Sequence, residues 1–111
     1  HRHIFALGDS AQYAGGRTLP YVMPIMHAAR ALAATLAGTR TPAVFPLMPV
    51  LIKTPALPLM VASPAPGTAG DWQSPEPGIW QFIDRQGRQC GFVLAGPQTA
   101  RRAELAQQVL A

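Results

Sequence analysis

The sequence IWQFIDRQGRQCGFVLA, residues 79–95, contains two apolar runs separated by a short polar segment. The first run, Ile79–Asp84, is apolar except for Gln81 and Asp84, and a second apolar run covers Cys90–Ala95. The segment between them, Arg85–Arg88, contains a glycine and is typical of a turn. The pattern therefore predicts a β-hairpin, and with it a sheet in the C-terminal part of the chain.

Shorter elements are expected on both sides of this hairpin. Prolines bound two apolar runs at 50–53 and 59–62, and a brief strand is expected at 72–74. After the hairpin, Thr99 is placed to cap a final helix over about 100–110. These elements predict a small antiparallel sheet with a terminal helix.

The N-terminal part of the chain has a different pattern. Its apolar residues recur at helical spacing from Val22 to Ala37, and Gly38 is placed to end that helix in a left-handed conformation. The apolar run His3–Leu7 predicts a short buried strand. The proline-containing segment 39–49 reads as a linker, so the predicted domain boundary lies near residue 40, and the fold class is α+β.

Composition excludes several classes of function. Only 13% of the 111 residues are charged, against about 25% in a typical domain, which indicates that more protein covers part of the surface. Lys and Arg outnumber Asp and Glu by 9 to 5, but they are scattered, so we expect an acidic protein partner and no nucleic acid. Cys90 is the single cysteine, which excludes an internal disulfide and a redox cysteine pair.

Other sequence signals are absent. No apolar run reaches the ~20 residues that span a bilayer, so we expect no membrane span. No signal peptide is visible. We expect a cytoplasmic location. No Gly-x-Gly-x-x-Gly motif or metal-ligand cluster occurs. We therefore expect no catalytic residue in this chain and no activity from it alone.

The sequence HIFALGD, residues 3–9, ends an apolar run in Gly8-Asp9. An aspartate after a buried strand can accept hydrogen bonds from sugar-type hydroxyls, and a preceding glycine lets a ligand approach the backbone. An ordinary turn at the end of a strand is the alternative. The helix start that follows, LPYVMP at 19–24, offers no capping side chain except Thr18. A ligand could cap it, or else water or Thr18 does.

Two longer stretches carry a resemblance to a known family. Residues 3–38, from HIFALGD to the end of the predicted helix, are similar to the end of the FAD-binding domain in NADH-dependent flavoprotein reductases. Residues 46–64, PLMPVLIKTPALPLMVASP, resemble the start of the C-terminal domain in rubredoxin reductases. The order of LPYVMP, KTP and a proline-flanked apolar strand is distinctive of that subgroup.

The resemblance implies a function for particular residues. Asp9, with Gly8 before it, matches the aspartate that binds the ribityl chain of FAD, and Tyr21–Met23 match the helix start at the flavin ring. Lys53 matches the lysine of the KTP segment near the active-site face. A lysine in an apolar strand is costly to bury without a partner, so the alternative is that Lys53 faces solvent.

The implied parent protein is an FAD-dependent NAD(P)H reductase that passes electrons to rubredoxin or a similar acidic carrier. Residues 1–40 would be the end of its FAD-binding domain, and 41–111 its C-terminal domain, with the remainder of the reductase as a further partner. The alternative is a non-enzymatic α+β module that binds a protein.

Overall fold

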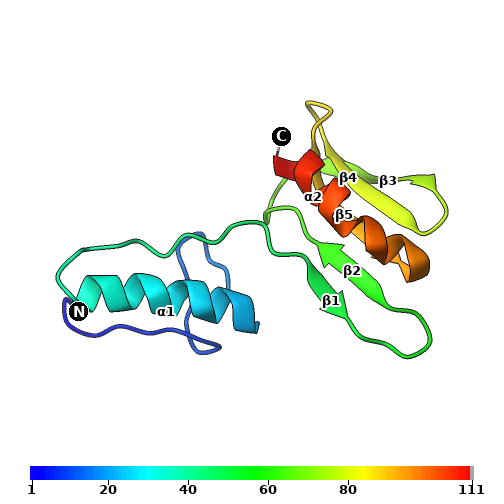
Figure 1. Cartoon of the computed structure of the whole chain (residues 1–111). Helices are drawn as coiled ribbons and strands as arrows, with labels where there is room; N and C mark the ends of the chain where they lie inside the picture. Colours follow the sequence, from blue (N-terminus) through cyan, green and yellow to red (C-terminus); the bar gives the residue numbers. More distant parts are fainter. Residues whose placement is uncertain (111) are drawn as a thin grey trace. The chain divides into compact units, whose positions relative to one another are not determined.

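The computed structural model describes residues 1–110, which form two compact units (Figure 1). The N-unit is His1–Pro46 and the C-unit begins at Leu47. The N-unit contains helix α1 (Val22–Leu36). The C-unit contains β1 (Val50–Ile52), β2 (Leu59–Ala62), β3 (Gly70–Glu76), β4 (Ile79–Asp84), β5 (Gln89–Ala95), the 3-10 helix η1 (Gly96–Arg101) and α2 (Arg102–Leu110). The assignment of domains to 1–40 and 41–111 stays a prediction, because compact units alone do not identify domains.

The five strands form one sheet in the order β1-β2-β5-β4-β3, with every neighbouring pair antiparallel. The predicted hairpin is confirmed as β4 and β5, which pair Ile79 with Leu94 and Phe82 with Gly91. A bulge after Phe82 shifts the register toward the turn. The predicted small antiparallel sheet with a terminal helix is therefore confirmed.

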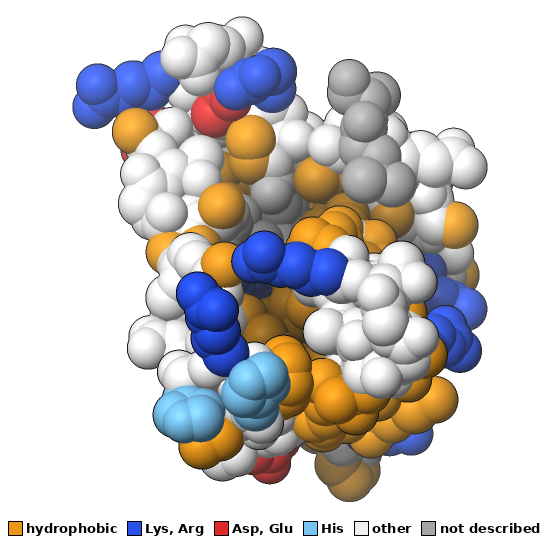
Figure 2. Space-filling view, turned by 90° about the vertical axis from the view of Figure 1, so that its left-hand side faces the viewer, with side chains coloured by type: hydrophobic (Ala, Val, Ile, Leu, Met, Phe, Trp, Pro, Cys, Tyr) orange, Lys and Arg blue, Asp and Glu red, His pale blue; other side chains and the backbone are white. Residues whose placement is uncertain are grey.

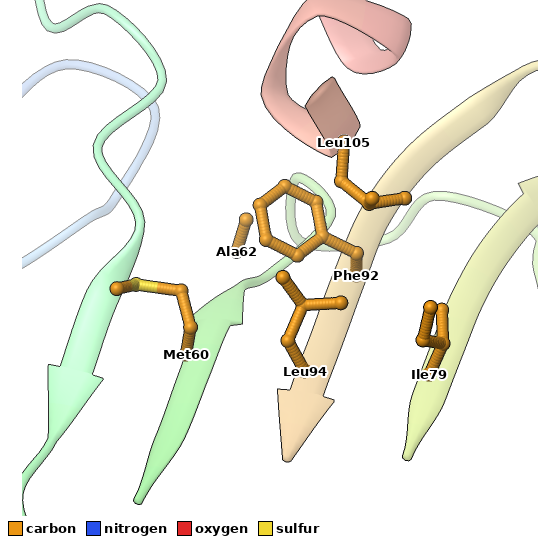
Figure 3. Packing of buried hydrophobic residues seen from close by; sticks show 6 residues of the cluster. All are labelled: Met60, Ala62, Ile79, Phe92, Leu94 and Leu105. Atoms are coloured by element: carbon orange, nitrogen blue, oxygen red, sulfur yellow. The ribbon is translucent and has the colours of Figure 1, made fainter. Parts of the chain in front are cut away.

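One face of this sheet carries the hydrophobic core (Figure 3). The register places Ile79, Leu94 and Met60 side by side, and Phe92 beside Ala62, so all five side chains share a face. Leu105 of α2 completes the cluster, and Phe92 lies between Ala62 and Leu105. Burying a side chain such as Phe or Leu contributes about 1.5–3 kcal/mol. This cluster is therefore the main source of stability in the C-unit.

The opposite face of the sheet carries large side chains without a helix over it. Trp80 pairs with Val93, which pairs with Val61, and Trp72 pairs with Phe82. The connection from β2 to β3 lies against part of this face, since a Cβ added at Gly91 would lie 2.8 Å from Cδ of Pro64. Only glycine fits there. Phe82 is buried on this face, with the Trp72 ring packed edge-on against it, and the two tryptophans are half-exposed.

The N-unit is built around α1, whose end agrees with the prediction. Gly38 has φ 103°, its N–H donates to the Thr35 carbonyl at 3.1 Å, and the Thr39 N–H donates to the Ala34 carbonyl at 2.9 Å. This is the Schellman arrangement that glycine favours. The only apolar side chains classed as buried in the N-unit are small ones, from Pro24, Ala11, Ala28 and Ala31. The N-unit therefore lacks a core of large side chains.

The predicted buried strand over His3–Leu7 is wrong. The segment forms no strand, and Ile4 and Phe5 are 70% and 48% exposed. A strand needs a neighbouring strand to accept and donate its backbone hydrogen bonds. Within residues 1–110, no strand pairs with His3–Leu7, so the apolar pattern alone cannot make one.

The predicted start of the final helix is also wrong. Residues Gly96–Arg101 form a 3-10 helix, and α2 begins only at Arg102. The Thr99 hydroxyl donates to the Gly96 carbonyl at 2.8 Å instead of accepting from a helix N–H. Pro97 at the start of η1 favours the tight turn that leads out of β5. Thr99 therefore stabilises this turn and does not cap the helix.

The core assignment predicts the effect of one substitution. Phe92→Ala should lower the free energy of unfolding of the chain by about 3–5 kcal/mol, because it leaves a cavity under α2. Urea unfolding followed by circular dichroism measures this loss. Phe5→Ala, which removes the same atoms from an exposed site, should change it by less than about 0.5 kcal/mol. Equal losses in the two variants would contradict the assignment.

Candidate functional site

The Gly8-Asp9 turn is held in place by Tyr13. Gly8 has φ 86°, and its N–H donates to the Tyr13 hydroxyl at 3.2 Å. The Tyr13 ring packs against Phe45 with the ring centroids 4.6 Å apart. No atom outside the neighbouring residues lies within 4 Å of a Cβ built on Gly8, so the backbone there is open to a ligand, and Asp9 is exposed. Tyr13 was not predicted as a site residue, because a single tyrosine in a glycine-rich loop is its only signal in the sequence.

The start of α1 has no side-chain cap. Its N-cap residue is Tyr21, in an extended conformation, and no side chain accepts a hydrogen bond from the first turn. Thr18 therefore does not cap the helix. The first turn also contains no acidic residue, and Val22 is 74% exposed. The N–H groups of this turn and the positive end of the helix dipole are available to an electron-rich group.

The six predicted cofactor-binding residues lie in both units. Gly8, Asp9 and Tyr21–Met23 belong to the N-unit, although among residues 1–110 no hydrogen bond links the Gly8-Asp9 turn to the helix start. Lys53 belongs to the C-unit, one residue beyond the end of β1, and it is exposed. Of the two interpretations of Lys53, the exposure agrees with the solvent-facing one. Its role near a flavin stays a prediction.

Thr54 organises the loop that carries Lys53. Its N–H donates to the Ile52 carbonyl at 3.1 Å, and its hydroxyl donates to the Leu57 carbonyl. Both bonds close the turn between β1 and β2. Lys53 is therefore presented by an ordered loop rather than by a strand.

A hollow of about 290 Å³ lies along the flank of α1 within the N-unit. It is lined by the extended segment 5–7, by segment 40–43 and by α1 side chains such as Ala28 and Leu32. Figure 2 shows hydrophobic side chains around a hollow, with basic side chains beside it. None of the predicted cofactor-binding residues lines this hollow. Its mostly apolar lining suits packing against further protein.

Among residues 1–110, the buried carboxylate is that of Asp84, at the β4–β5 turn. It accepts hydrogen bonds from the backbone N–H groups of Arg88, at 2.8 Å, and Gln86, at 2.9 Å, and it forms an ion pair with the Arg88 guanidinium at 2.9 Å. These donors, the Arg88 backbone N–H first, hold the pKa of Asp84 below its ordinary value. The N–H donors, from Gln86 and Arg88, all come from the turn itself, so Asp84 acts in structure rather than in catalysis.

Cys90 lies beside this carboxylate, with Sγ 3.5 Å from Oδ2 of Asp84. Burial, followed by the neighbouring carboxylate, raises the pKa of the thiol. The thiolate is the nucleophilic form of cysteine, and a raised pKa keeps its population low at neutral pH. We therefore expect Cys90 to be chemically unreactive at neutral pH.

In the part of the chain that the structure describes, no group of three or more His, Cys, Asp or Glu side chains could hold a metal ion. Neither of the α-helices in residues 1–110 is long and apolar enough to cross a membrane.

Comparison with known proteins identifies the family. A family model described as the rubredoxin binding C-terminal domain matches residues 42–109, which cover the whole sheet and most of α2. The chain belongs to this family. The resemblance to rubredoxin reductases that the sequence indicated is therefore confirmed.

Curated relatives extend the similarity into the N-unit. The chain is 41% identical over 110 residues to a rubredoxin-NAD(+) reductase of Alcanivorax borkumensis, a match that covers 96% of this chain and 28% of the relative. It is also 41% identical over 110 residues to a nitric oxide reductase FlRd-NAD(+) reductase of Aeromonas hydrophila, with the same coverage. A rubredoxin-NAD(+) reductase of Acinetobacter baylyi is 42% identical over 102 residues, or 89% of this chain and 26% of the relative. The chain thus spans little more than a quarter of these relatives.

The bonds around Asp84 predict a pH dependence of stability. The folded pKa is lowered, so the stabilisation should be complete above the ordinary Asp pKa of about 3.9 and should be lost as the pH falls below it. Asp84→Asn should therefore lower Tm by several degrees at pH 7 and by less in acid. Thermal unfolding of both proteins across this range measures the difference. Asp71→Asn, at an exposed position, is the control, and a difference that does not change with pH would contradict the prediction.

Proposed function

We propose that the chain is the C-terminal segment of an FAD-dependent NAD(P)H reductase. In the complete protein, electrons would pass from NADH through FAD to rubredoxin or a similar small acidic carrier. The observation that carries this proposal is the match of residues 42–109 to the rubredoxin binding C-terminal domain. The names of the relatives, rubredoxin-NAD(+) reductase among them, support it. Because the chain spans 28% of those relatives, the NAD(P)H site and the rest of the FAD site would belong to the remainder of the reductase.

Each unit has a part in this proposal. Residues 1–40 are the end of the FAD-binding domain, and 41–111 form the C-terminal domain that contacts the carrier. The Asp9 carboxylate would accept hydrogen bonds from the ribityl hydroxyls, with Gly8 leaving space for the ligand. When bound, FAD takes up electrons as hydride and can release them singly. We place the complete protein in the cytoplasm.

The start of α1 fits a flavin in both shape and charge. It presents uncapped N–H groups and an exposed apolar surface at Tyr21–Met23. The apolar side chains can contact the ring, and the N–H groups can donate to the ring edge where negative charge accumulates on reduction. Lys53, on its ordered loop, would add a positive charge on the active-site face.

A second candidate function is a non-enzymatic α+β module that binds a protein partner. The observation that favours it is the core of the C-unit, which is built entirely from residues of the C-unit. The open reading frame upstream of His1 separates the two candidates. Several hundred further codons with two glycine-rich dinucleotide motifs would support the reductase, and a start codon close to His1 would support the module.

The role of Asp9 can be tested in the full-length protein that contains this chain. We expect the full-length protein to purify with bound FAD. Asp9→Ala should weaken FAD binding about tenfold or more, because hydrogen bonds to a charged acceptor contribute about 1.5–3 kcal/mol. FAD absorbance and equilibrium dialysis measure this effect. Asp71→Ala removes an exposed carboxylate elsewhere and should leave FAD binding unchanged. A colourless protein that binds no added FAD would rule out the proposed function.

Tyr13 provides a second test of the same site. Tyr13→Phe keeps the ring against Phe45 but removes the acceptor for the Gly8 N–H. The turn should become less ordered, with a loss of about 1 kcal/mol, which corresponds to FAD binding weaker by about fivefold. The same dialysis measures it, and the melting temperature of the C-unit should not change. Unchanged FAD affinity would show that Tyr13 does not position the turn.

A further inference from the structure

The sheet of the C-unit has an exposed apolar face, which we call the open face and define by Ile52, Val61, Trp72, Trp80 and Val93. Strand alternation and register place these five side chains on the side opposite α2. Trp72 and Trp80 are 47% and 39% exposed, and Ile52 is 42% exposed. Large half-exposed aromatic side chains on a regular sheet are typical of protein interfaces.

The two units differ in whether their exposed apolar surface must be covered by further protein. The N-unit buries only small apolar side chains and leaves residues such as Ile4 and Phe5 exposed, so it needs permanent cover from further protein. The C-unit has a complete core of its own under α2. Its open face is therefore free for a partner that binds and leaves, and an electron carrier must do both.

The charges of the C-unit favour an acidic partner. Three of its carboxylates are paired internally, Asp84 with Arg88 and both Glu76 and Glu104 with Arg101. The register places one charged strand residue on the open face, Asp84, whose carboxylate is buried and paired with Arg88, and it places Asp71 on the opposite side of β3. The strand directions put Lys53 at one end of the sheet and Arg85 at the other. In residues 1–110, neither of these two cations forms an ion pair.

We propose that the open face is the surface on which the acidic electron carrier docks, with Trp80 next to the central strand β5, Trp72 on the edge strand β3, and Lys53 and Arg85 at opposite ends of the strands. The inference rests on the proposed function and adds the location of the contact. The family match supports rubredoxin as the partner on this face, since the matched residues 42–109 include every residue of the open face. An apolar centre with basic ends fits a small protein that has an apolar patch inside an acidic rim.

Titration calorimetry of the full-length protein with oxidised rubredoxin tests this inference. Trp80→Ser and Ile52→Ser should each raise Kd about tenfold or more, as expected when a large apolar side chain that binding buries is replaced by a polar one. Leu36→Ser removes an exposed apolar side chain from α1 and should change Kd less than about twofold. Lys53→Glu should weaken binding, whereas Arg102→Glu, the same charge change at the start of α2, should have little effect.

Each other outcome overturns the inference in a recognisable way. If rubredoxin binds and the open-face variants bind equally well, the carrier docks elsewhere, while the proposed function stands. If both serine variants unfold the full-length protein but leave the 111-residue chain folded, the rest of the reductase covers the open face. If the unaltered protein sediments as a dimer and Trp80→Ser as a monomer, the open face is a dimer interface. If the unaltered protein binds no rubredoxin, the proposed function itself fails.

Discussion

The structure of the C-unit depends on the burial of Phe92 between the sheet and α2. Phe92 and Leu94 are fully buried, and the partners that bury them come from β2, β4 and α2. A sheet with only one helix can cover only one of its faces in this way. The packing of Phe92 therefore decides which face is filled by the chain itself and which is left for other molecules.

Polar contacts fix α2 over that face. The Gln89 side-chain amide donates to the Leu105 carbonyl at 3.3 Å, and Gln81 donates to Gln89 at 2.8 Å. The Arg101 guanidinium bonds to Glu76 at the end of β3 and to Glu104 in α2. It also lowers the pKa of Glu104. These contacts orient a helix whose hydrophobic packing rests mainly on Leu105, with Ala106 and Val109 beside it.

The N-unit shows the opposite balance between local and long-range contacts. The end of α1 is fixed locally by Gly38 and by Thr35, whose hydroxyl donates to the Ala31 carbonyl and accepts from the Thr41 N–H, each at 3.0 Å. The start of α1 and the segment His3–Leu7 have no comparable partners among residues 1–110. Elements that satisfy their own hydrogen bonds were predictable, whereas the apolar run at His3–Leu7 was misread because a strand depends on its neighbours.

The amino-acid sequence alone determined the β4–β5 hairpin, α1 with its glycine end, the α+β class and the resemblance to rubredoxin reductases. Periodicity and turn residues act over a few positions, so they can be read without coordinates. Only the tertiary structure decided that Tyr13 supports Gly8, that Thr99 lies within η1, that Lys53 is exposed beyond β1 and that Trp80 faces away from α2. Each of these depends on which segments meet in space, because register and packing assign side chains to a face, and local sequence does not specify either.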